Sequence, residues 1–324
     1  MKNLKTKTET KKILTVIFSL LKTLAAVVIV FLFYDKFQDN WSELKNYNWN
    51  INYLFLFLSF VFHLIAFTAF SKIWCILISA FGHHVHLKHA FKIAYITNLG
   101  RYIPGKIWPV IGMVYLAKQL DIPEETSVTS WVIAMIFTIP AAFIVVFLAI
   151  LFSPDVYADS MGTFLNSGFY FLSALLLAGS LLLLFAPNKT FVFFNYVLKK
   201  LKRPLLTFQL NIQTAFIIYF GYTVCWILYG FAFWLLVSSL ITDISIPIIP
   251  TIGTFVLAYQ VGYLAFFAPG GIGVREVIIS TLLFPILGPI TSGIAIAARV
   301  WNMIVELLAT LIAWLIRLPN GKRF

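Results

Sequence analysis

The sequence predicts an all-α integral membrane protein, and three observations support this prediction. The 324 residues are 61% hydrophobic and only 11% charged, with a mean hydropathy of +0.93. Because about a quarter of a soluble domain is charged, lipid must cover much of this apolar surface. Several apolar runs are long enough to cross a hydrocarbon core of ~30 Å as helices. The runs are continuous rather than alternating, which indicates helices and excludes an outer-membrane barrel.

Six of these runs have the length of a full transmembrane helix. They cover about 13–34, 51–79, 128–153, 168–187, 215–240 and 293–316. The first run follows a basic N-terminus, as the apolar part of a signal peptide would. It is too long for a signal peptide and no small-residue cleavage site follows it, so we expect a retained first span.

Two further apolar regions, 91–118 and 247–288, are each interrupted by a Pro-Gly pair. Such a pair stops a helix. A continuous span through the first region would carry Arg101 and Lys106 into lipid at a cost of several kcal/mol. A re-entrant hairpin with its tip buried in protein avoids this cost. We therefore predict two re-entrant Pro-Gly hairpins beside the six spans.

The basic residues follow the positive-inside rule when both hairpins return to the side from which they enter. The predicted cytoplasmic segments then hold 18 of the 24 Lys and Arg residues. These segments are 1–12, 80–127, 188–214 and 317–324. The predicted external segments hold only Lys36 and Lys45 as basic residues. This distribution predicts a multi-pass protein with both termini in the cytoplasm, and it explains the net charge of +12 without nucleic acid.

An internal repeat is suggested by a shift of 165 residues. The shift places the first Pro-Gly pair on the second, and Thr126-Ser127 on Thr291-Ser292. The order of elements is the same in both copies: span, broken hairpin, Thr-Ser pair, span. We interpret the chain as a single transmembrane domain with two repeats. The domain covers 1–324, repeat A about 51–153 and repeat B about 216–316.

Three crossings separate equivalent points of the two repeats, and an odd number inverts the second copy. Inverted repeats with broken helices are typical of secondary transporters, whose sites lie near the midplane of the membrane. We therefore expect the two hairpins to meet and to form the transport site.

The two Pro-Gly motifs resemble those of a known family. The first reads Gly-Arg-Tyr-x-Pro-Gly-Lys-x-Trp from Gly100 to Trp108, and the second Pro-Gly-Gly-x-Gly-x-Arg-Glu from Pro269 to Glu276. In this order and separation they are similar to the transmembrane region of the lysylphosphatidylglycerol synthases, which is often called flippase-like. The resemblance covers about 13–316. Only seven residues follow Arg317, so we expect a stand-alone member without the synthetase domain of the best-known relatives.

The resemblance implies a flippase-like membrane transporter and no enzyme. Such a protein would move an anionic phospholipid, or a lipid-linked sugar or polyprenyl phosphate, between leaflets during cell-envelope biogenesis. The expected location is a bacterial or archaeal plasma membrane. Expected partners are membrane lipids with anionic head groups and envelope-biosynthesis proteins, with no nucleic acid and no cofactor. Two alternatives stay open: a membrane accessory subunit or enzyme of a glycosyltransferase or polysaccharide pathway, and a small-solute secondary transporter.

Charged side chains inside a membrane are costly and usually functional. The planar fork of arginine suits a phosphodiester group, because it donates paired hydrogen bonds. We expect the head-group contacts among Arg101, Lys106, Trp108, Arg275, Glu276, Arg299 and Glu306. Glu276 is a candidate for positioning Arg275 or for exchanging a proton. The alternative is a structural set of ion pairs, such as Glu276 with Arg101 or Arg299.

The glycine and proline residues of the hairpins are interpreted as backbone devices, since glycine permits positive φ and close approach. They are Gly100, Pro104, Gly105, Pro269, Gly270, Gly271 and Gly273. A phosphate-binding nest of freed amides is the alternative interpretation. The histidine cluster at 83–89 lacks nearby carboxylates, so we expect an interfacial segment in contact with anionic lipid and no metal site.

Overall fold

The computed structural model describes residues 41–103, 107–158, 211–265 and 268–319, together with a few isolated positions. Every regular element within these ranges is a helix. Two of the six predicted spans, 13–34 and 168–187, lie almost wholly outside the described residues. The number of six spans therefore stays a prediction.

Four helical segments in the described ranges are long and apolar enough to cross a membrane. They are α3 (Tyr53–Ala80), α6 (Glu124–Phe152), α9 (Ile212–Leu240) and the segment Phe284–Leu315, which includes α13 (Thr291–Leu315). Each coincides with one of the predicted runs to within a few residues, except that the last segment starts earlier. The prediction of an all-α membrane protein is confirmed.

The ends of the long helices follow from local sequence. Asn52 caps α3, where its side chain accepts a hydrogen bond from the Phe55 amide at 3.1 Å. Asn211 caps α9 in the same way and accepts from the Thr214 amide at 2.7 Å. An asparagine at this position satisfies an amide that has no partner inside the helix. The two helices that begin the predicted repeats thus start with the same device.

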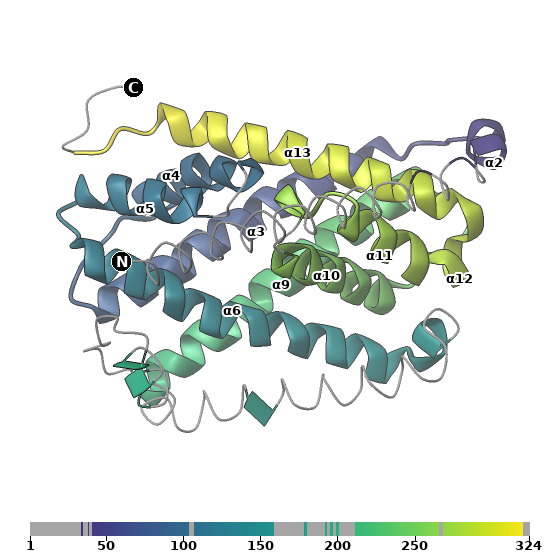
Figure 1. The fold of residues 1–324 in the computed structure, drawn as a ribbon. Helices are drawn as coiled ribbons and strands as arrows, with labels where there is room; N and C mark the ends of the chain where they lie inside the picture. Colours follow the sequence, from purple (N-terminus) through teal and green to yellow (C-terminus); the bar gives the residue numbers. More distant parts are fainter. Residues whose placement is uncertain are drawn as a thin grey trace, which may run out of the picture.

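Each Pro-Gly region consists of two helices joined by a short 3₁₀ turn. The first contains α4 (Leu87–Asn98), η1 (Leu99–Tyr102) and α5 (Trp108–Lys118). The second contains α10 (Ile248–Leu264), η2 (Pro269–Gly271) and α11 (Val274–Leu282). Figure 1 shows the first region on one side of the molecule and the second on the other, with α3 and α9 running between them.

The chain breaks at the second region because three glycines have positive φ. Gly270, Gly271 and Gly273 have φ of +60°, +71° and +84°, which L side chains rarely adopt. In the first region Pro104, Gly105 and Lys106 lie outside the described residues. The predicted turn at that Pro-Gly pair is therefore not tested, and the re-entrant course of both regions stays a prediction.

The contacts between helices are symmetric under exchange of the two sets. The arm α4 packs on α3 and α13, while α10 packs on α9 and α6. The arm α5 packs on α6, while α11 packs on α13, and α3 packs along α9. The counterparts are α3 and α9, α4 and α10, α5 and α11, and α6 and α13. Exchanging each helix for its counterpart turns every one of these contacts into a contact of the same set. Two structural repeats would produce this pattern; their boundaries and inverted topology stay predictions.

Three shorter elements are α2 (Trp41–Asn46), α12 (Phe284–Leu287) and η3 (Gly288–Ile290), and residues 154–158 are also helical. The helix α2 contacts η3, and the Tyr47 hydroxyl just after it donates to Asp243 Oδ2 at 3.2 Å. Burial and the neighbouring Asp243 carboxylate raise the pKa of the Tyr47 phenol above its usual range. This contact ties α2 to the loop between α9 and α10.

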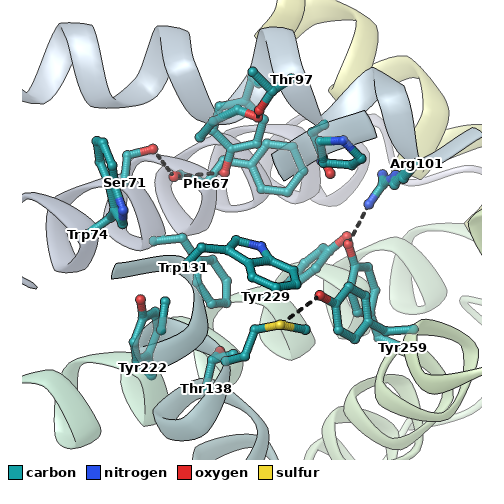
Figure 2. A pocket seen from close by; sticks show the side chains of 18 of the residues that line it. Phe67, Ser71, Trp74, Thr97, Arg101, Trp131, Thr138, Tyr222, Tyr229 and Tyr259 are labelled. Carbon is teal, nitrogen blue, oxygen red and sulfur yellow. Dashed lines mark hydrogen bonds between the residues drawn. The ribbon is translucent and has the colours of Figure 1, made fainter. Parts of the chain in front are cut away.

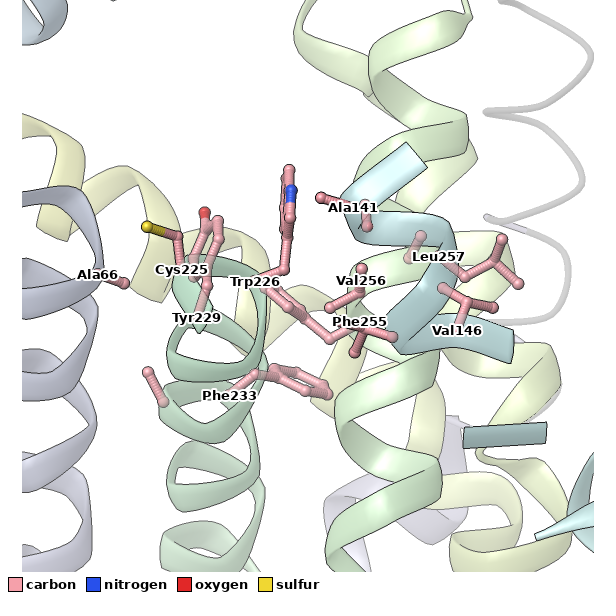
Figure 3. Close-up of a cluster of buried hydrophobic side chains, with 14 of the residues drawn as sticks. Ala66, Ala141, Val146, Cys225, Trp226, Tyr229, Phe233, Phe255, Val256 and Leu257 are labelled. Carbon is pink, nitrogen blue, oxygen red and sulfur yellow. The ribbon is translucent and has the colours of Figure 1, made fainter. Parts of the chain in front are cut away.

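The core lies where α9 and α10 meet, with α3 and α6 on either side. Trp226, Tyr229 and Phe233 of α9 face Phe255 of α10, and Ala141 of α6 lies next to them (Figure 3). Small residues such as alanine let membrane helices approach closely. This cluster of packed aromatic side chains supports the two broken regions.

Candidate functional site

The two breaks meet inside the helix bundle. The turn η1 contacts η2, although more than 150 residues separate them in the sequence. A Cβ atom built on Gly270 would lie 3.0 Å from the Tyr102 ring and 3.2 Å from Arg299 Nη2. Glycine is therefore needed at this position for its conformation and for space.

The first break places Arg101 and Tyr102 against α10 and α13. Arg101 Nη1 donates to the Tyr259 hydroxyl at 2.8 Å, and the guanidinium forms an ion pair with Glu306. The Tyr102 hydroxyl donates to Glu306 Oε2 at 2.7 Å, and the Asn302 amide donates to Glu306 Oε1. The buried Glu306 carboxylate thus accepts hydrogen bonds from two side chains, forms an ion pair with a third, and anchors the first break to α13.

Arg275, at the start of α11, has a different environment. Its guanidinium carbon lies 3.8 Å from the centroid of the Tyr259 ring, a cation–π contact. Its side chain is 8% exposed, its Nε has no hydrogen-bond partner, and no carboxylate of the described residues lies within ion-pair distance. Gly262 leaves room for it, because a Cβ there would meet Arg275 Cγ at 2.6 Å.

Arg299 of α13 contacts the backbone of the second break and the side chain of Glu276. Its Nη1 donates to the Gly270 carbonyl at 3.0 Å, and its Nε lies 3.8 Å from Glu276 Oε1. The second carboxylate oxygen of Glu276 has no hydrogen-bond partner in the described part of the chain. One of the ion pairs considered from the sequence, Glu276 with Arg299, is therefore present. Arg101 pairs with Glu306 instead of Glu276.

A cavity of about 380 Å³ lies against both breaks. Arg101, Gly270, Gly271 and Arg275 line it, and the walls come from α3, α4, α5, α6, α9 and α10. In Figure 2, Phe67 and Thr97 lie along one side, Tyr222 and Thr138 along the opposite side, and Arg101 with Tyr259 at one end.

The cavity occupies one half of the bundle. Its lining residues fall in the C-terminal half of α3, at 67–74, and in the N-terminal half of α6, at 131–138. Both segments lead to the end of the molecule that the charge distribution predicts to be cytoplasmic. Buried aromatic side chains such as Phe233 and Phe255 lie in the other half.

The structure divides the predicted site residues into three groups. Arg101 and Arg275 line the cavity. Glu276, Arg299 and Glu306 do not line the cavity. Glu306 pairs with Arg101, while Arg299 pairs with Glu276 and donates to the carbonyl of Gly270 in the glycine turn. Trp108, which is 45% exposed, is not among the residues that line the cavity. Lys106 lies outside the described residues, and the binding roles of all these residues stay predictions.

The glycines have the geometry that was expected of backbone devices. A Cβ on Gly100 would lie 2.9 Å from Trp108 Cβ, so this residue allows η1 to approach the start of α5. Gly270, Gly271 and Gly273 form the second turn, and the Pro269 backbone begins it. In the described ranges no three His, Cys, Asp or Glu side chains are grouped as metal ligands would be.

Several residues of the site were not singled out from the sequence. Tyr259 joins the two arginines, and Gln260 lines the cavity beside it. Asn302 links Glu306 to Tyr229, whose hydroxyl donates to the Asn302 side chain. One signal was available, since Asn302 lies four residues before Glu306 and such residues share a helical face. Gln260 was also a lone amide in a long apolar run.

Comparison with known proteins identifies one family. The family model described as "Lysylphosphatidylglycerol synthase TM region" matches residues 14–313. Neither the curated proteins nor the solved structures gave a significant match. The matched range contains both broken regions and all the helices of the site. The chain therefore belongs to the lysylphosphatidylglycerol synthase TM region family, and it is a membrane protein of the lipid and cell-envelope type.

Proposed function

We propose that this protein is a lipid translocator that takes the anionic head group of a lipid into the cavity between the two broken regions. The observation that carries the proposal is Arg275, a buried cation that lines the cavity and has no carboxylate partner among the described residues. A buried charge without a partner is costly, and a bound phosphate group would supply the missing negative charge.

The charges around the site favour an anion. Three arginines and two glutamates lie together at the breaks, so the cluster carries one positive charge in excess. Arg101 and Arg299 each face a glutamate. The excess charge is therefore found on Arg275, and its guanidinium faces the cavity wall formed by Tyr259. This geometry suits charge-assisted hydrogen bonds to a phosphodiester.

Translocation would use Arg101 as a second contact. A phosphate group on Arg275 lies in the same cavity as Arg101, where it competes with Glu306 for the guanidinium. Loss of the pair with Glu306 frees the first break from α13. The bound anion thus weakens the link that holds the two breaks in their present arrangement, while the acyl or prenyl tails stay in lipid. This coupling lets head-group binding shift the equilibrium between two conformations.

We propose that the protein lies in a plasma membrane, that both of its termini are in the cytoplasm, and that the cavity opens to the cytoplasmic leaflet. Its substrates come from the membrane itself, and its partners are the proteins that make or use these lipids. We propose no catalytic role, because both glutamates near the cavity face arginines and neither lines the cavity.

The test is a leaflet-exchange assay in reconstituted vesicles. Phosphatidylglycerol with a fluorescent head group is placed in both leaflets, and a membrane-impermeant reductant quenches only the outer leaflet. Wild-type protein should raise the quenched fraction above one half, and the Arg275→Met variant should not. If folded wild-type protein leaves the distribution unchanged and co-purifies with a soluble transferase, the accessory-subunit alternative is favoured over translocation.

A further inference from the structure

The chain has almost no negative charge to offer a cationic head group. Of the Asp and Glu residues in the described ranges, only Glu276 and Glu306 are buried. Both face arginines, and neither lines the cavity. A head group with an ammonium would meet Arg275, which no carboxylate of the described residues balances. An aminoacylated lipid is therefore a poor ligand for this cavity.

Gln260 indicates what the ligand carries besides its phosphate. Its side chain is 1% exposed and lines the cavity, and its carbonyl Oε1 has no hydrogen-bond partner. A buried acceptor of this kind needs a donor. A phosphodiester can only accept, so it leaves Gln260 unsatisfied. A hydroxyl group supplies the donor, and it adds no positive charge beside the arginines.

The cavity walls suit a ring with neutral hydroxyl groups. Trp74, Trp131 and Trp226 line the cavity, and Trp226 is fixed because its Nε1 donates to the Thr138 carbonyl at 3.1 Å. A sugar or inositol ring can lay its C–H face on such an aromatic surface while its edges form hydrogen bonds. Aromatic faces also attract ammonium groups, but the two arginines in the same cavity oppose this.

The volume fits a head group and excludes whole lipids. Cavities that hold small ligands measure about 300–1,000 Å³, and this one, at about 380 Å³, lies near the lower limit. A phosphate with one ring can be accommodated, while the tails must remain outside between the helices and the lipid.

From these observations we infer that the natural ligand is a lipid whose phosphodiester carries an uncharged, hydroxyl-bearing ring, with the phosphate on Arg275 and the ring between the tryptophans and Gln260. This inference rests on the proposed binding of an anionic lipid head group. A ring of this kind occurs on glycerol-based lipids and on polyprenyl phosphates, and the chemistry of the cavity is the same for both.

The experiment is lipid competition on the intact protein in nanodiscs, measured by native mass spectrometry. The probes are phosphatidylinositol, a glucosyl-phosphoryl polyprenol, phosphatidylglycerol, lysylphosphatidylglycerol and phosphatidylcholine. We expect the two ring-bearing lipids to be retained about tenfold more than phosphatidylglycerol, which corresponds to about 1.4 kcal/mol. Lysylphosphatidylglycerol should be retained no better than phosphatidylcholine. Unequal retention of the two ring-bearing lipids would identify the source of the ring and support the inference.

Two variants separate the inference from the proposed function. Gln260→Met should lower the retention of the ring-bearing lipids strongly, and that of phosphatidylglycerol by a smaller factor, because its glycerol head group also carries hydroxyl donors. Arg275→Met should lower both. Equal retention of phosphatidylinositol and phosphatidylglycerol by the wild type, or strong retention of lysylphosphatidylglycerol, would overturn the ring assignment alone. If folded wild-type protein prefers no anionic lipid to phosphatidylcholine, the proposed function fails as well.

Discussion

At the scale of single residues, Arg275 and Arg101 show that two buried arginines in one cavity can have opposite effects on stability. The charge of Arg101 is balanced by the Glu306 carboxylate, and its guanidinium also donates a hydrogen bond to the Tyr259 hydroxyl. Arg275 has only the face of Tyr259 and no carboxylate among the described residues. An unpaired buried charge is destabilising, so Arg275 is a residue kept at a cost in stability.

The first prediction follows for the Arg275→Met variant, which keeps a long side chain and removes the charge. Its melting temperature in detergent without added lipid should equal or exceed that of the wild type, because an unpaired buried cation is gone. Its retention of phosphatidylglycerol should fall at least about tenfold, a loss of about 1.4 kcal/mol. Arg275→Lys is the matched control and should keep part of the retention. A large drop in melting temperature for Arg275→Met would show that the arginine is a structural residue.

The second prediction concerns Glu306 and is opposite in direction. Glu306→Gln leaves Arg101 buried without a counter-charge, which costs about 3–5 kcal/mol and should lower the melting temperature strongly. Glu276→Gln is the control, since the Arg299 pair is long at 3.8 Å and Arg299 keeps its bond to the Gly270 carbonyl. We expect a loss of at most about 1 kcal/mol for this control. Equal losses in the two variants would contradict the assigned ion pairs.

The charges of the site could be located from the sequence, and one of their two ion pairs, Glu276 with Arg299, was among the pairs considered; the pair of Arg101 with Glu306 was not. The cost of a charge in a membrane is a property of the residue, so Arg275 and Glu306 could be singled out from composition alone. Which arginine pairs with which glutamate depends on how α13 is rotated about its axis and on the depth of each break in the bundle. Packing determines both. Tyr259 was missed for a related reason, because one tyrosine in an apolar run does not differ from a lipid-facing one.

At the scale of elements, the contact between η1 and η2 depends on Gly270. Gly270→Ala adds a methyl group 3.0 Å from the Tyr102 ring at a φ of +60°. Gly82→Ala is the control, because Gly82 has a φ of +82° and nothing within 4 Å of its would-be Cβ. We expect the control to lose only the backbone term of about 1–2 kcal/mol. The melting temperature should fall further for Gly270→Ala than for Gly82→Ala, and Gly270→Ala should also weaken phosphatidylglycerol retention. Equal effects of the two variants would contradict a tight contact between η1 and η2.

The described long helices could be predicted within a few residues because hydropathy and span length are properties of the sequence itself. The position of the second break was also predictable, because glycine and proline act locally, while the first Pro-Gly pair lies outside the described residues. Short elements such as α2 and α12 were not predicted. Their helical form depends on contacts with the bundle, since helices of six and four residues are not stable alone.

At the scale of the whole molecule, the cavity lies in one half of the bundle and a cluster of buried aromatic side chains lies in the other. In this cluster the His63 ring lies 4.3 Å from Trp301 and 4.5 Å from Tyr229, between ring centroids. Phe233 and Phe255 stack at 4.7 Å. If the protein is the translocator that we propose, the half with the cavity is the open half and the half with the aromatic cluster is the sealed half, as in one of the two states of an alternating-access protein.

The orientation of the open half gives a prediction about accessibility. In a background with Cys75→Ala and Cys225→Ala, we place one cysteine at Met135, which lines the cavity, and in a second variant at Ala141, which is buried in the core. A membrane-impermeant thiol reagent should label Met135→Cys in inside-out vesicles and not in right-side-out vesicles. Ala141→Cys should stay unlabelled in both. Labelling of Met135→Cys from outside alone would reverse the proposed orientation.

The sealed half gives the last prediction, because a translocator must open it to release the head group to the other leaflet. Phe233→Cys and Phe255→Cys, in the same cysteine-free background, place two thiols on neighbouring faces of α9 and α10. A short bifunctional thiol reagent should then lock the seal. Leaflet exchange should stop while phosphatidylglycerol retention continues, because the cavity lies in the other half, and reduction of a cleavable reagent should restore exchange. Either single variant treated with the same reagent controls for modification alone. Continued exchange in the fully cross-linked protein would mean that the head group does not pass between α9 and α10, and the translocation path would have to be sought elsewhere in the bundle.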